Sequence, residues 1–362
     1  MAANTTLVTG FPGFIGRRLV RALIDASRKQ TIVCLVEPRM KDVATAAAAE
    51  IDAKRVEIVT GDIGARDLGL DRAVGDRLVE EMTNCFHLAA IYDLAVPIEL
   101  AQRINVDGTG NVLDLCRAAK RLERLDYVST AYVAGVRTGV VYEHELALGQ
   151  AHKHHYESTK FQAEVWVREL QDVVPAAIYR PAIVVGDSRT GETQKFDGPY
   201  YLLRTIALSA ARGQPIIQFG RSDAAFNAVP VDFIIEALVA GSRDPDAIGH
   251  AFHLTDPDPI SSGALLSALA REYAGREPSM KVPPRLVENA LRIRRVRDLY
   301  SGAPRESIRY LNHPQRFDTR QASEMLTRAG VSCPSVEDYI GPIVAFFREH
   351  EADPAFAPAR GT

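Results

Sequence analysis

The chain has 362 residues, 46% hydrophobic and 25% charged, a balance typical of a globular protein with a large buried core. Its formal net charge of -3, from 43 basic and 46 acidic side chains, gives no electrostatic basis for wholesale nucleic-acid binding. The N-terminal sequence lacks the pattern of a secretory signal, and no apolar run is long enough to span a membrane. We therefore expect a cytoplasmic protein without a transmembrane segment.

Short β-branched runs alternate with helical patterns through the first half of the chain. The strands are predicted at "TTLVTG", "TIVCLV", "VEIVTGD", "NCFHLAA", "LDYVSTAYV" and "AAIYRPAIVVG", with a helix from about Phe14 to Ser27 after the first. These runs are almost continuously apolar, as expected when helices cover both faces of a sheet. The alternation predicts an α/β fold with a doubly wound parallel Rossmann sheet.

The first glycine motif, "TGFPGFIG", stands between the first strand and its helix. A phosphate-binding turn needs glycine where the backbone bends, where it approaches the pyrophosphate, and where helix and strand pack closely. The helix N-terminus then offers N–H groups and a positive dipole to the phosphates. The motif predicts a dinucleotide site at Gly10, Phe11, Gly13, Phe14, Ile15 and Gly16.

The second strand ends in "LVEPRMK", which bears on the choice of cofactor. An acidic residue there accepts hydrogen bonds from the adenosine ribose, whereas an arginine accommodates a 2′-phosphate. Glu37 would repel that phosphate and Arg39 would attract it. The residues alone leave NADH and NADPH both open.

The stretch "HHYESTKFQAE" places Tyr156 four residues before Lys160, so on a helix the two side chains share one face. A lysine ammonium near a tyrosine, together with the positive nicotinamide ring of an oxidised cofactor, favours the phenolate and lowers the tyrosine pKa. Such a pair suits proton transfer to or from an oxygen during hydride transfer. The alternative is a surface pair without function; the other motifs favour the active-site interpretation.

After Gly186 the alternation stops at a polar stretch, "GDSRTGETQKFDGPYY". A helix is predicted at "YYLLRTIALSAARG", and its residues 200–203 either line an apolar pocket or form core. We predict a Rossmann domain at 1–185 and 226–257. A smaller, mostly helical substrate cap is expected at 186–225 and 258–350, followed by a flexible tail at 351–362.

Cysteine and histidine placement gives no metal site. Cys34, Cys85 and Cys116 stand in apolar segments and are expected to be buried small hydrophobic residues in a reducing compartment. The run "HKHH" at 152–155 lacks acidic or cysteine companions at ligand spacing, so we predict an ordinary loop there. The arginine-rich segment at 285–297 is a candidate contact for CoA or an anionic membrane surface, with a solvated helix face as the alternative.

The ordered set "TGFPGFIG", "GDI", "FHLAA", "INVDGTGNV", "YVSTAYVAG", "YESTK" and "YRPAIVVG" resembles the extended short-chain dehydrogenases/reductases over nearly the whole chain. Two later segments, "FNAVPVDFIIEALVAG" and "AFHLTDPDPIS", are similar to the branch of fatty acyl-CoA reductases and carboxylic acid reductases, which are thioester reductases. The resemblance implies a catalytic set of Thr130, Tyr156 and Lys160, with Ser129 as the less favoured alternative to Thr130. It implies that Asn105 braces the active-site helix and that the cofactor contacts Asp62, Ile63, Leu88, Ala89, Ala90, Tyr156, Lys160, Pro181 and Ile183.

The same resemblance implies an NAD(P)(H)-dependent oxidoreductase that moves hydride to or from a carbonyl or hydroxyl of an apolar substrate. A fatty acyl thioester or a long-chain aldehyde is favoured, and a homodimer is common in the superfamily. The alternatives are a sugar-nucleotide epimerase or dehydratase, a hydroxysteroid-like secondary alcohol dehydrogenase and, last, a non-catalytic dinucleotide sensor. The branch usually uses NADPH and carries arginine where this chain has Glu37, so Glu37 favours NADH.

Overall fold

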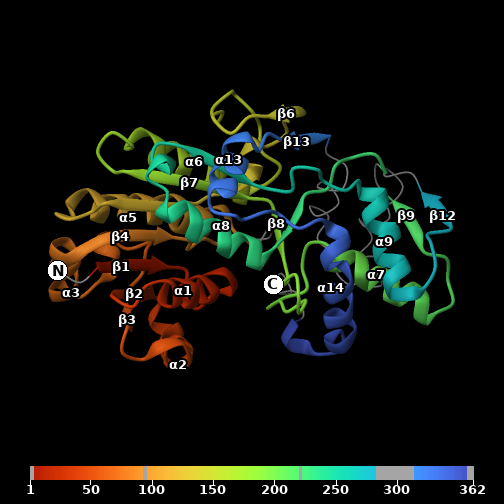
Figure 1. Cartoon of the computed structure of the whole chain (residues 1–362), viewed down its shortest axis with the longest axis horizontal. Helices are drawn as coiled ribbons and strands as arrows, with labels where there is room; N and C mark the ends of the chain where they lie inside the picture. The colour runs from red at the N-terminus through yellow and green to blue at the C-terminus, as the bar shows by residue number, and fades with distance from the viewer. Residues whose placement is uncertain (1–3, 93–95, 220–221, 283–313, 357–362) are drawn as a thin grey trace.

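The structure is a computed structural model that describes residues 4–92, 96–219, 222–282 and 314–356. Its centre is a sheet of seven parallel strands in the order β11-β7-β5-β4-β1-β2-β3 (Figure 1). The predicted doubly wound parallel sheet is therefore confirmed. Its strands are β1 (Asn4–Thr9), β2 (Gln30–Val36), β3 (Val56–Thr60), β4 (Met82–His87), β5 (Arg124–Val128), β7 (Ala176–Pro181) and β11 (Ala251–Leu254).

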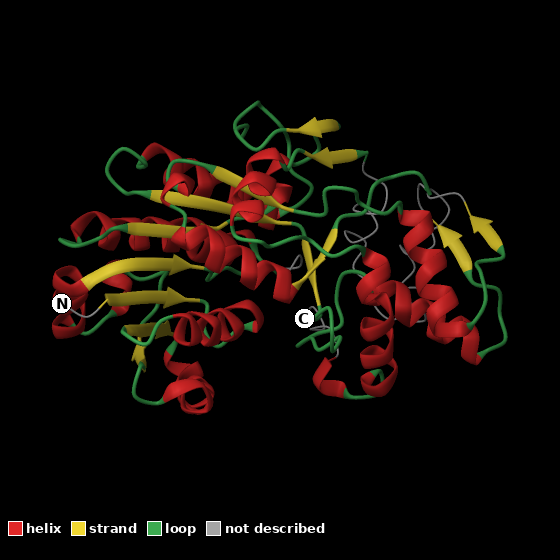
Figure 2. Ribbon diagram, in the orientation of Figure 1, coloured by secondary structure: helices red, strands yellow, loops and turns green. Residues whose placement is uncertain are grey.

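Helices cover both faces of this sheet, which explains the apolar character of its strands (Figure 2). On α1 the buried residues Leu19, Val20, Leu23 and Ile24 recur at short helical steps, so one apolar stripe faces the core. One face carries α1 (Phe14–Ala26), α2 (Lys41–Asp52), α8 (Val231–Arg243) and α13 (Arg320–Arg328). The other carries α3 (Arg72–Glu81), α5 (Gly108–Ala118) and α6 (His155–Glu169).

The strand order reverses between β1 and β4, with β2 and β3 on one side and β5, β7 and β11 on the other. In open α/β sheets, ligands bind outside the carboxyl ends of the strands at such a reversal. The glycine turn leaves the end of β1, and the Leu88–Ala90 segment leaves the end of β4. The topology thus brings two predicted parts of the cofactor site to one crevice.

A third hydrophobic cluster lies away from the sheet, on the right of Figure 1. Leu203, Ile206, Leu266 and Phe347 are among its buried members. Its helices are α7 (Tyr200–Ala211), α9 (Ser262–Ala274) and α14 (Val336–His350). Three parallel two-stranded pairs lie outside the main sheet: β8 (Ile183–Val185) with β10 (Ala228–Pro230), β9 (Ile217–Phe219) with β12 (Met280–Val282), and β6 (Gly139–Val141) with β13 (Gln315–Phe317).

Two predicted strands are shorter than their apolar runs. The run "AAIYRPAIVVG" divides at Ala182, so β7 belongs to the main sheet while β8 pairs with β10. The run "LDYVSTAYV" leaves the sheet after Val128, because the Thr130 side chain accepts a hydrogen bond from the Tyr132 N–H and caps a short 3₁₀ turn. Both breaks lie at the carboxyl ends of strands of the main sheet, the edge at which ligands bind in open α/β sheets.

Short segments connect these elements. The helical segment that contains "INVDGTGNV" begins with α4 (Ile98–Ala101) and a π-helix, η3 (Gln102–Asp107), before α5. π-Helical turns are rare and are frequent at functional sites. The 3₁₀ segments are η1 (Pro38–Met40), η2 (Arg66–Gly69), η4 (Ala131–Ala134), η5 (Pro245–Ala247) and η6 (Pro354–Phe356).

Several smaller predictions are resolved by burial. Cys34, Cys85 and Cys116 are buried, as predicted. Tyr200, with Leu202 and Leu203, is buried in the third cluster, which favours the core interpretation of that segment. Phe356 stacks on the ring of Phe196, so the first six residues of the predicted tail reach this cluster.

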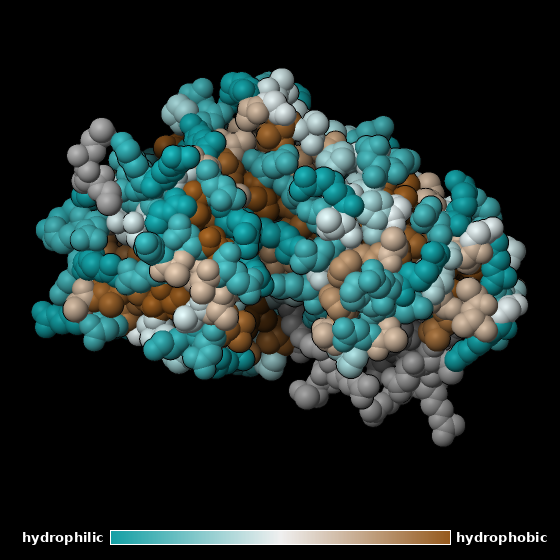
Figure 3. All heavy atoms as spheres, turned by 60° about the horizontal axis from the view of Figure 1, so that its bottom comes forward, coloured by the Kyte–Doolittle hydropathy of each residue, from teal (hydrophilic) through white to brown (hydrophobic). Residues whose placement is uncertain are grey.

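The surface of the described residues is mixed in character. On the face shown in Figure 3, hydrophilic residues cover most of the outer surface, and hydrophobic residues gather in recesses near the middle. Within the described ranges, no helix combines the length and hydropathy of a membrane span. The arginine-rich segment at 285–297 lies outside the described residues.

Candidate active site

The glycine turn after β1 has the close packing that a phosphate cradle requires. Gly10 has a φ of +89°, and a Cβ there would lie 3.0 Å from the Ala89 nitrogen. A Cβ on Gly13 would lie 2.9 Å from the Gly10 carbonyl oxygen, and one on Gly16 would clash with the same oxygen. No side chain caps the N-terminus of α1 at Gly13, so its first N–H groups remain available to an anion. The turn fits the pyrophosphate of a dinucleotide.

The two charges at the end of β2 are paired with each other. Arg39 lies on η1, and its Nε donates a hydrogen bond to the Glu37 carboxylate. Both side chains are well exposed. Glu37 and Arg39, which were predicted to distinguish a free ribose from a 2′-phosphate, thus partly neutralise each other. The geometry alone leaves NADH and NADPH both open.

Asp62, a predicted cofactor contact, has a neighbour that we did not expect from the sequence. The Asp62 carboxylate accepts a hydrogen bond from the Gly64 N–H at 2.9 Å and pairs with Arg103 of the π-helix η3. Ile63 is buried below them, where a Cβ on Gly108 would lie 3.0 Å from it. Arg103 stands two residues before Asn105, which was predicted to hold the active-site helix. A single arginine in a helical pattern gave no sequence signal that it would pair with Asp62.

Thr130, Tyr156 and Lys160 come together where β5 ends and α6 begins. A hydrogen bond joins the Thr130 and Tyr156 side chains. The Lys160 ammonium donates to the Tyr127 hydroxyl and to the Val128 carbonyl oxygen, each at 2.8 Å. Lysine has three N–H donors, so one has no partner among the described residues and is available to a ribose hydroxyl. The spacing predicted this shared face correctly, although it did not predict where the ammonium points.

Burial dominates the electrostatics of the Tyr–Lys pair. Burial raises the pKa of Tyr156 to about 12, against the lowering effect of its bond to Thr130. Burial also lowers the pKa of Lys160 to about 7, against the raising effect of Glu164. The Lys160 ammonium does not offset the rise in the tyrosine pKa, because it bonds to Tyr127 and Val128 of β5. The lowering of the tyrosine pKa by the ammonium together with an oxidised nicotinamide ring stays a prediction. At neutral pH the tyrosine is protonated and can donate its proton.

Asn105 braces α6, as the resemblance implied. Its amide nitrogen donates to the Thr159 hydroxyl and to the Ile91 carbonyl oxygen, each at 3.0 Å. Its amide oxygen accepts from the Ile91 N–H at 2.8 Å. The bonds fix the start of the active-site helix against the segment after β4. That segment contains Leu88, Ala89 and Ala90, three of the predicted cofactor contacts, all of them partly exposed.

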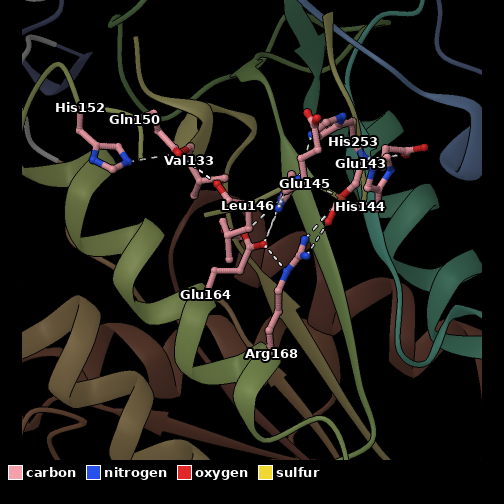
Figure 4. A network of polar contacts seen from close by, with 12 residues as sticks. Val133, Glu143, His144, Glu145, Leu146, Gln150, His152, Glu164, Arg168 and His253 are labelled. Atoms are coloured by element: carbon pink, nitrogen blue, oxygen red, sulfur yellow. Dashed lines mark hydrogen bonds and ion pairs between the residues drawn. The ribbon is translucent and has the colours of Figure 1, made fainter. Parts of the chain in front are cut away.

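Ser129, the less favoured candidate, points to a buried ion-pair network and away from Tyr156. Its hydroxyl donates to Glu164 at 2.6 Å. Glu164 also accepts from Arg168 and, at 2.6 Å, from Arg180, which lies just before Pro181 (Figure 4). Arg180 and Glu164 are fully buried, so their charges need each other. The network locks α6 to β5 and β7 behind the site.

A second acidic residue ties the C-terminal segment to the same network. The Glu143 carboxylate accepts hydrogen bonds from the N–H groups of His253, Gln321 and Ala322. The last two begin α13, so Glu143 caps that helix (Figure 4). Arg180 in turn donates to the Glu143 carbonyl oxygen. Sequence reasoning missed Glu143, Glu164 and Arg180, since their partners are distant in the chain.

The histidine run is structural. His154 is the N-cap of α6, and its side chain accepts from the Glu157 N–H. The His152 ring contacts the Val133 carbonyl oxygen. Across the described part of the chain, no group of three or more His, Cys, Asp or Glu residues is placed to hold a metal ion. Of the remaining predicted contacts, Pro181 ends β7, and its carbonyl oxygen lies 3.5 Å from the Thr130 hydroxyl, whereas Ile183 begins β8.

Comparison with known proteins assigns the family. Residues 8–238 match the model of an NAD-binding family described as male sterility protein. The chain belongs to the male sterility protein family. The terminal reductase (R) domain of the myxalamid biosynthetic pathway has the same fold, with a TM-score of 0.82, 26% identity, and coverage of 98% of this chain and 93% of that one.

Two further relatives outline the neighbourhood of this family. A carboxylic acid reductase of Mycobacterium tuberculosis is 26% identical over 70% of this chain and 24% of its own length. A UDP-glucuronic acid 4-epimerase of Bacillus cereus, solved with NAD, shares the fold at a TM-score of 0.65 and 20% identity, over 95% of this chain and 99% of its own. The chain spans between 7% and 28% of the length of the first curated relatives that it matches. The predicted membership of the extended short-chain dehydrogenases/reductases, close to the thioester reductases, is confirmed, and with it the assignment to the NAD(P)-dependent oxidoreductases.

Proposed function

We propose that the chain reduces the carbonyl group of an apolar acyl thioester or long-chain aldehyde. The observation that carries this proposal is the placement of Thr130 beside Tyr156 at the end of β5, where Lys160 bonds to Tyr127 and Val128. A nicotinamide dinucleotide supplies the hydride when it is bound. The family match and the likeness to reductase domains support reduction over the alternatives.

The three side chains divide the work by chemistry. The Tyr156 hydroxyl, protonated at neutral pH, donates its proton to the substrate oxygen. The Thr130 hydroxyl holds that oxygen by a hydrogen bond as negative charge develops on it. Lys160, with its remaining N–H, holds a ribose hydroxyl of the cofactor and places a positive charge near the phenolate that forms.

The predicted contacts would hold the cofactor. The N–H groups that begin α1 would bind its pyrophosphate, and Asp62, beside Arg103, would accept a hydrogen bond from the adenine amino group. We propose that NADH is accepted at least as well as NADPH, because Arg39 is already paired with Glu37 and gives a 2′-phosphate little advantage. Glu37→Gln should release Arg39 and improve NADPH affinity about tenfold, with Arg66→Gln, an exposed arginine on η2, as the control. A wild-type preference for NADPH above tenfold would contradict this choice.

The substrate enters beside the third hydrophobic cluster. Tyr92 follows the β4 segment, and its ring lies 5.5 Å from the Lys195 ammonium of the polar stretch after β8. That stretch therefore reaches across the crevice next to the catalytic residues. We propose that the cap at 186–225 and 258–350 binds the apolar part of the substrate over the Rossmann domain. A reducing, cytoplasmic location remains a prediction, supported by the burial of the cysteine thiols, and the homodimer remains one too.

A panel assay tests the proposal. The protein is incubated with NADH or NADPH and with acyl-CoAs, aldehydes and ketones of graded chain length, and separately with UDP-sugars. Cofactor oxidation is followed at about 340 nm, where reduced nicotinamide absorbs. We expect oxidation with acyl thioesters or long-chain aldehydes. Turnover confined to ketones would contradict the proposal, and so would epimerisation of a UDP-sugar without net oxidation, detected by chromatography of the sugar nucleotide.

A further inference from the structure

Five buried polar side chains form a continuous path below the site. They come from five different elements, β1, β4, α5, β5 and α6, and none is more than 1% exposed. Along the path, the Thr9 hydroxyl lies 2.7 Å from His87 Nδ1, and His87 Nε2 lies 3.0 Å from the Thr109 hydroxyl. The Thr109 hydroxyl lies beside the Tyr127 hydroxyl, and Lys160 donates to Tyr127. The path thus joins the glycine turn to Lys160.

The direction of the first bonds follows from counting protons. A threonine hydroxyl has one proton and two acceptor lone pairs. The Thr9 oxygen accepts from the N–H groups of Leu88 at 3.2 Å and Ala89 at 3.1 Å. Its proton is therefore donated to His87 Nδ1, which must be unprotonated. The hydrogen of a neutral His87 lies on Nε2 and is donated to Thr109.

The other half of the path meets the first half at Thr109. Thr109 donates its own proton to the Asn105 carbonyl oxygen at 2.7 Å. It can therefore only accept from His87 and from Tyr127, and Tyr127 in turn accepts from Lys160. The bond from His87 and the contact from Tyr127 both end on the Thr109 oxygen. A proton could therefore pass from Lys160 to His87 only if the donors and acceptors along the path exchanged roles. Burial lowers the pKa of His87 to about 3, which keeps the ring neutral.

We propose that His87 is a positioning residue that, as its neutral Nε2–H tautomer, couples the cofactor-binding turn to Lys160. Through Thr9 it fixes the Leu88–Ala89 backbone against Gly10. Through Thr109 and Tyr127 it holds the Lys160 ammonium in place. The inference about catalysis rests on the proposed function, whereas the tautomer and the coupling to cofactor binding do not.

The tautomer is tested without any turnover. The protein is labelled with ¹⁵N-histidine, and ring nitrogen shifts are recorded from pH 5 to 8 for the wild type and for His87→Gln, which assigns the signal. We expect one neutral ring with Nε2 protonated that does not titrate over this range and is missing from the variant. A His87 ring that titrates in this range, or that carries its hydrogen on Nδ1, would overturn the proposal.

The coupling is tested with threonine variants that keep the fold. Thr109→Val removes the shared acceptor at nearly constant volume, and Thr109→Ser restores the hydroxyl. We expect Thr109→Val to weaken cofactor binding, measured by calorimetry, about tenfold and to lower kcat about tenfold, and Thr109→Ser to recover most of both. Thr83→Val, an equally buried deletion earlier on β4, is the control and should affect stability alone.

Each outcome is decisive. Unchanged cofactor affinity and kcat in a folded Thr109→Val protein would refute the coupling. If Thr109→Val does not fold, Tyr127→Phe breaks only the lysine arm and should lower kcat and shift its pH profile, while an unchanged profile would refute it. If the wild type turns over no substrate, the proposed function fails, and the tautomer and the cofactor affinities still decide the coupling.

Discussion

Lys160 should make the protein less stable, and its removal should stabilise it. The side chain is buried, and burial lowers its pKa from 10.5 to about 7. Between pH 7 and 10.5 the unfolded chain binds more protons than the folded one, so this group makes stability rise with pH. Below pH 7 the lysine is charged in both states and its full burial penalty is present. The lysine is thus kept for its function at a cost in folding free energy.

The size of the effect follows from the shift. A pKa lowered from 10.5 to about 7 corresponds to about 5 kcal/mol of penalty. Lys160→Met removes this penalty but also deletes the bonds to Tyr127 and Val128, at about 1–3 kcal/mol. We therefore expect Lys160→Met to raise the free energy of unfolding by about 2–4 kcal/mol at pH 7 or below, and by about zero or less near pH 10.

Urea unfolding at pH 6, 8 and 10 measures the difference between wild type and variant. Lys54→Met, at an exposed lysine, is the matched control and should show no pH-dependent difference. The variant should also lose turnover, which would separate the stabilising effect from the catalytic one. A Lys160→Met protein that is less stable than the wild type at pH 6, with a difference that does not change up to pH 10, would refute the reasoning.

Three further predictions concern the other groups. Burial lowers the pKa of His253 to about 3, so its stabilising contribution is fully present above about pH 6.5 and is lost as the pH falls toward 3. Acid unfolding, followed by circular dichroism, should therefore be less steep in His253→Gln and unchanged in His250→Gln, which alters an exposed histidine. Equal unfolding curves for the two variants would contradict this prediction. Gly16→Ala should weaken cofactor binding at least about tenfold, because the added Cβ meets the Gly10 carbonyl oxygen. The control is Gly75→Ala in α3, where the Cβ meets open space; this change should raise the free energy of unfolding by about 0.5–1 kcal/mol. Equal cofactor affinities of the Gly16→Ala protein and the wild type in calorimetry would argue against the phosphate turn. Glu143→Gln leaves at least one of three N–H groups without an acceptor and should lower the free energy of unfolding by about 1–3 kcal/mol. The control, Glu80→Gln at an exposed glutamate, should change it little. Equal urea midpoints for Glu143→Gln and the wild type would exclude the capping role.

The sequence predicted the parts of the site that depend on local spacing. Glycine spacing gave the turn, because each glycine is required by a contact within a few residues or at the next strand. The four-residue step from Tyr156 to Lys160 gave their common helix face. The continuous apolar runs gave the parallel sheet, since both of its faces are covered.

The parts that it did not predict depend on distant contacts. An apolar run reads the same whether it forms one strand or two, so the break at Ala182 required knowledge of the pairing of β8 with β10. The ion pair of Glu164 and Arg180 joins residues 16 apart, and Glu143 caps a helix nearly 180 residues later. The direction of the Lys160 ammonium depends on Tyr127, which lies on β5 and is 33 residues away in the chain, so the spacing of Tyr156 and Lys160 could not predict it.

The most direct test of the central claim is the rate of cofactor oxidation in matched tyrosine variants. Tyr156→Phe removes the proton donor, and Tyr142→Phe makes the same deletion at an exposed site just after β6. With the best thioester or aldehyde of the panel, we predict a fall in kcat of about 10²–10⁴-fold for Tyr156→Phe, with cofactor affinity retained, and no change for Tyr142→Phe. Turnover by Tyr156→Phe at the wild-type rate would contradict the assignment of the active site.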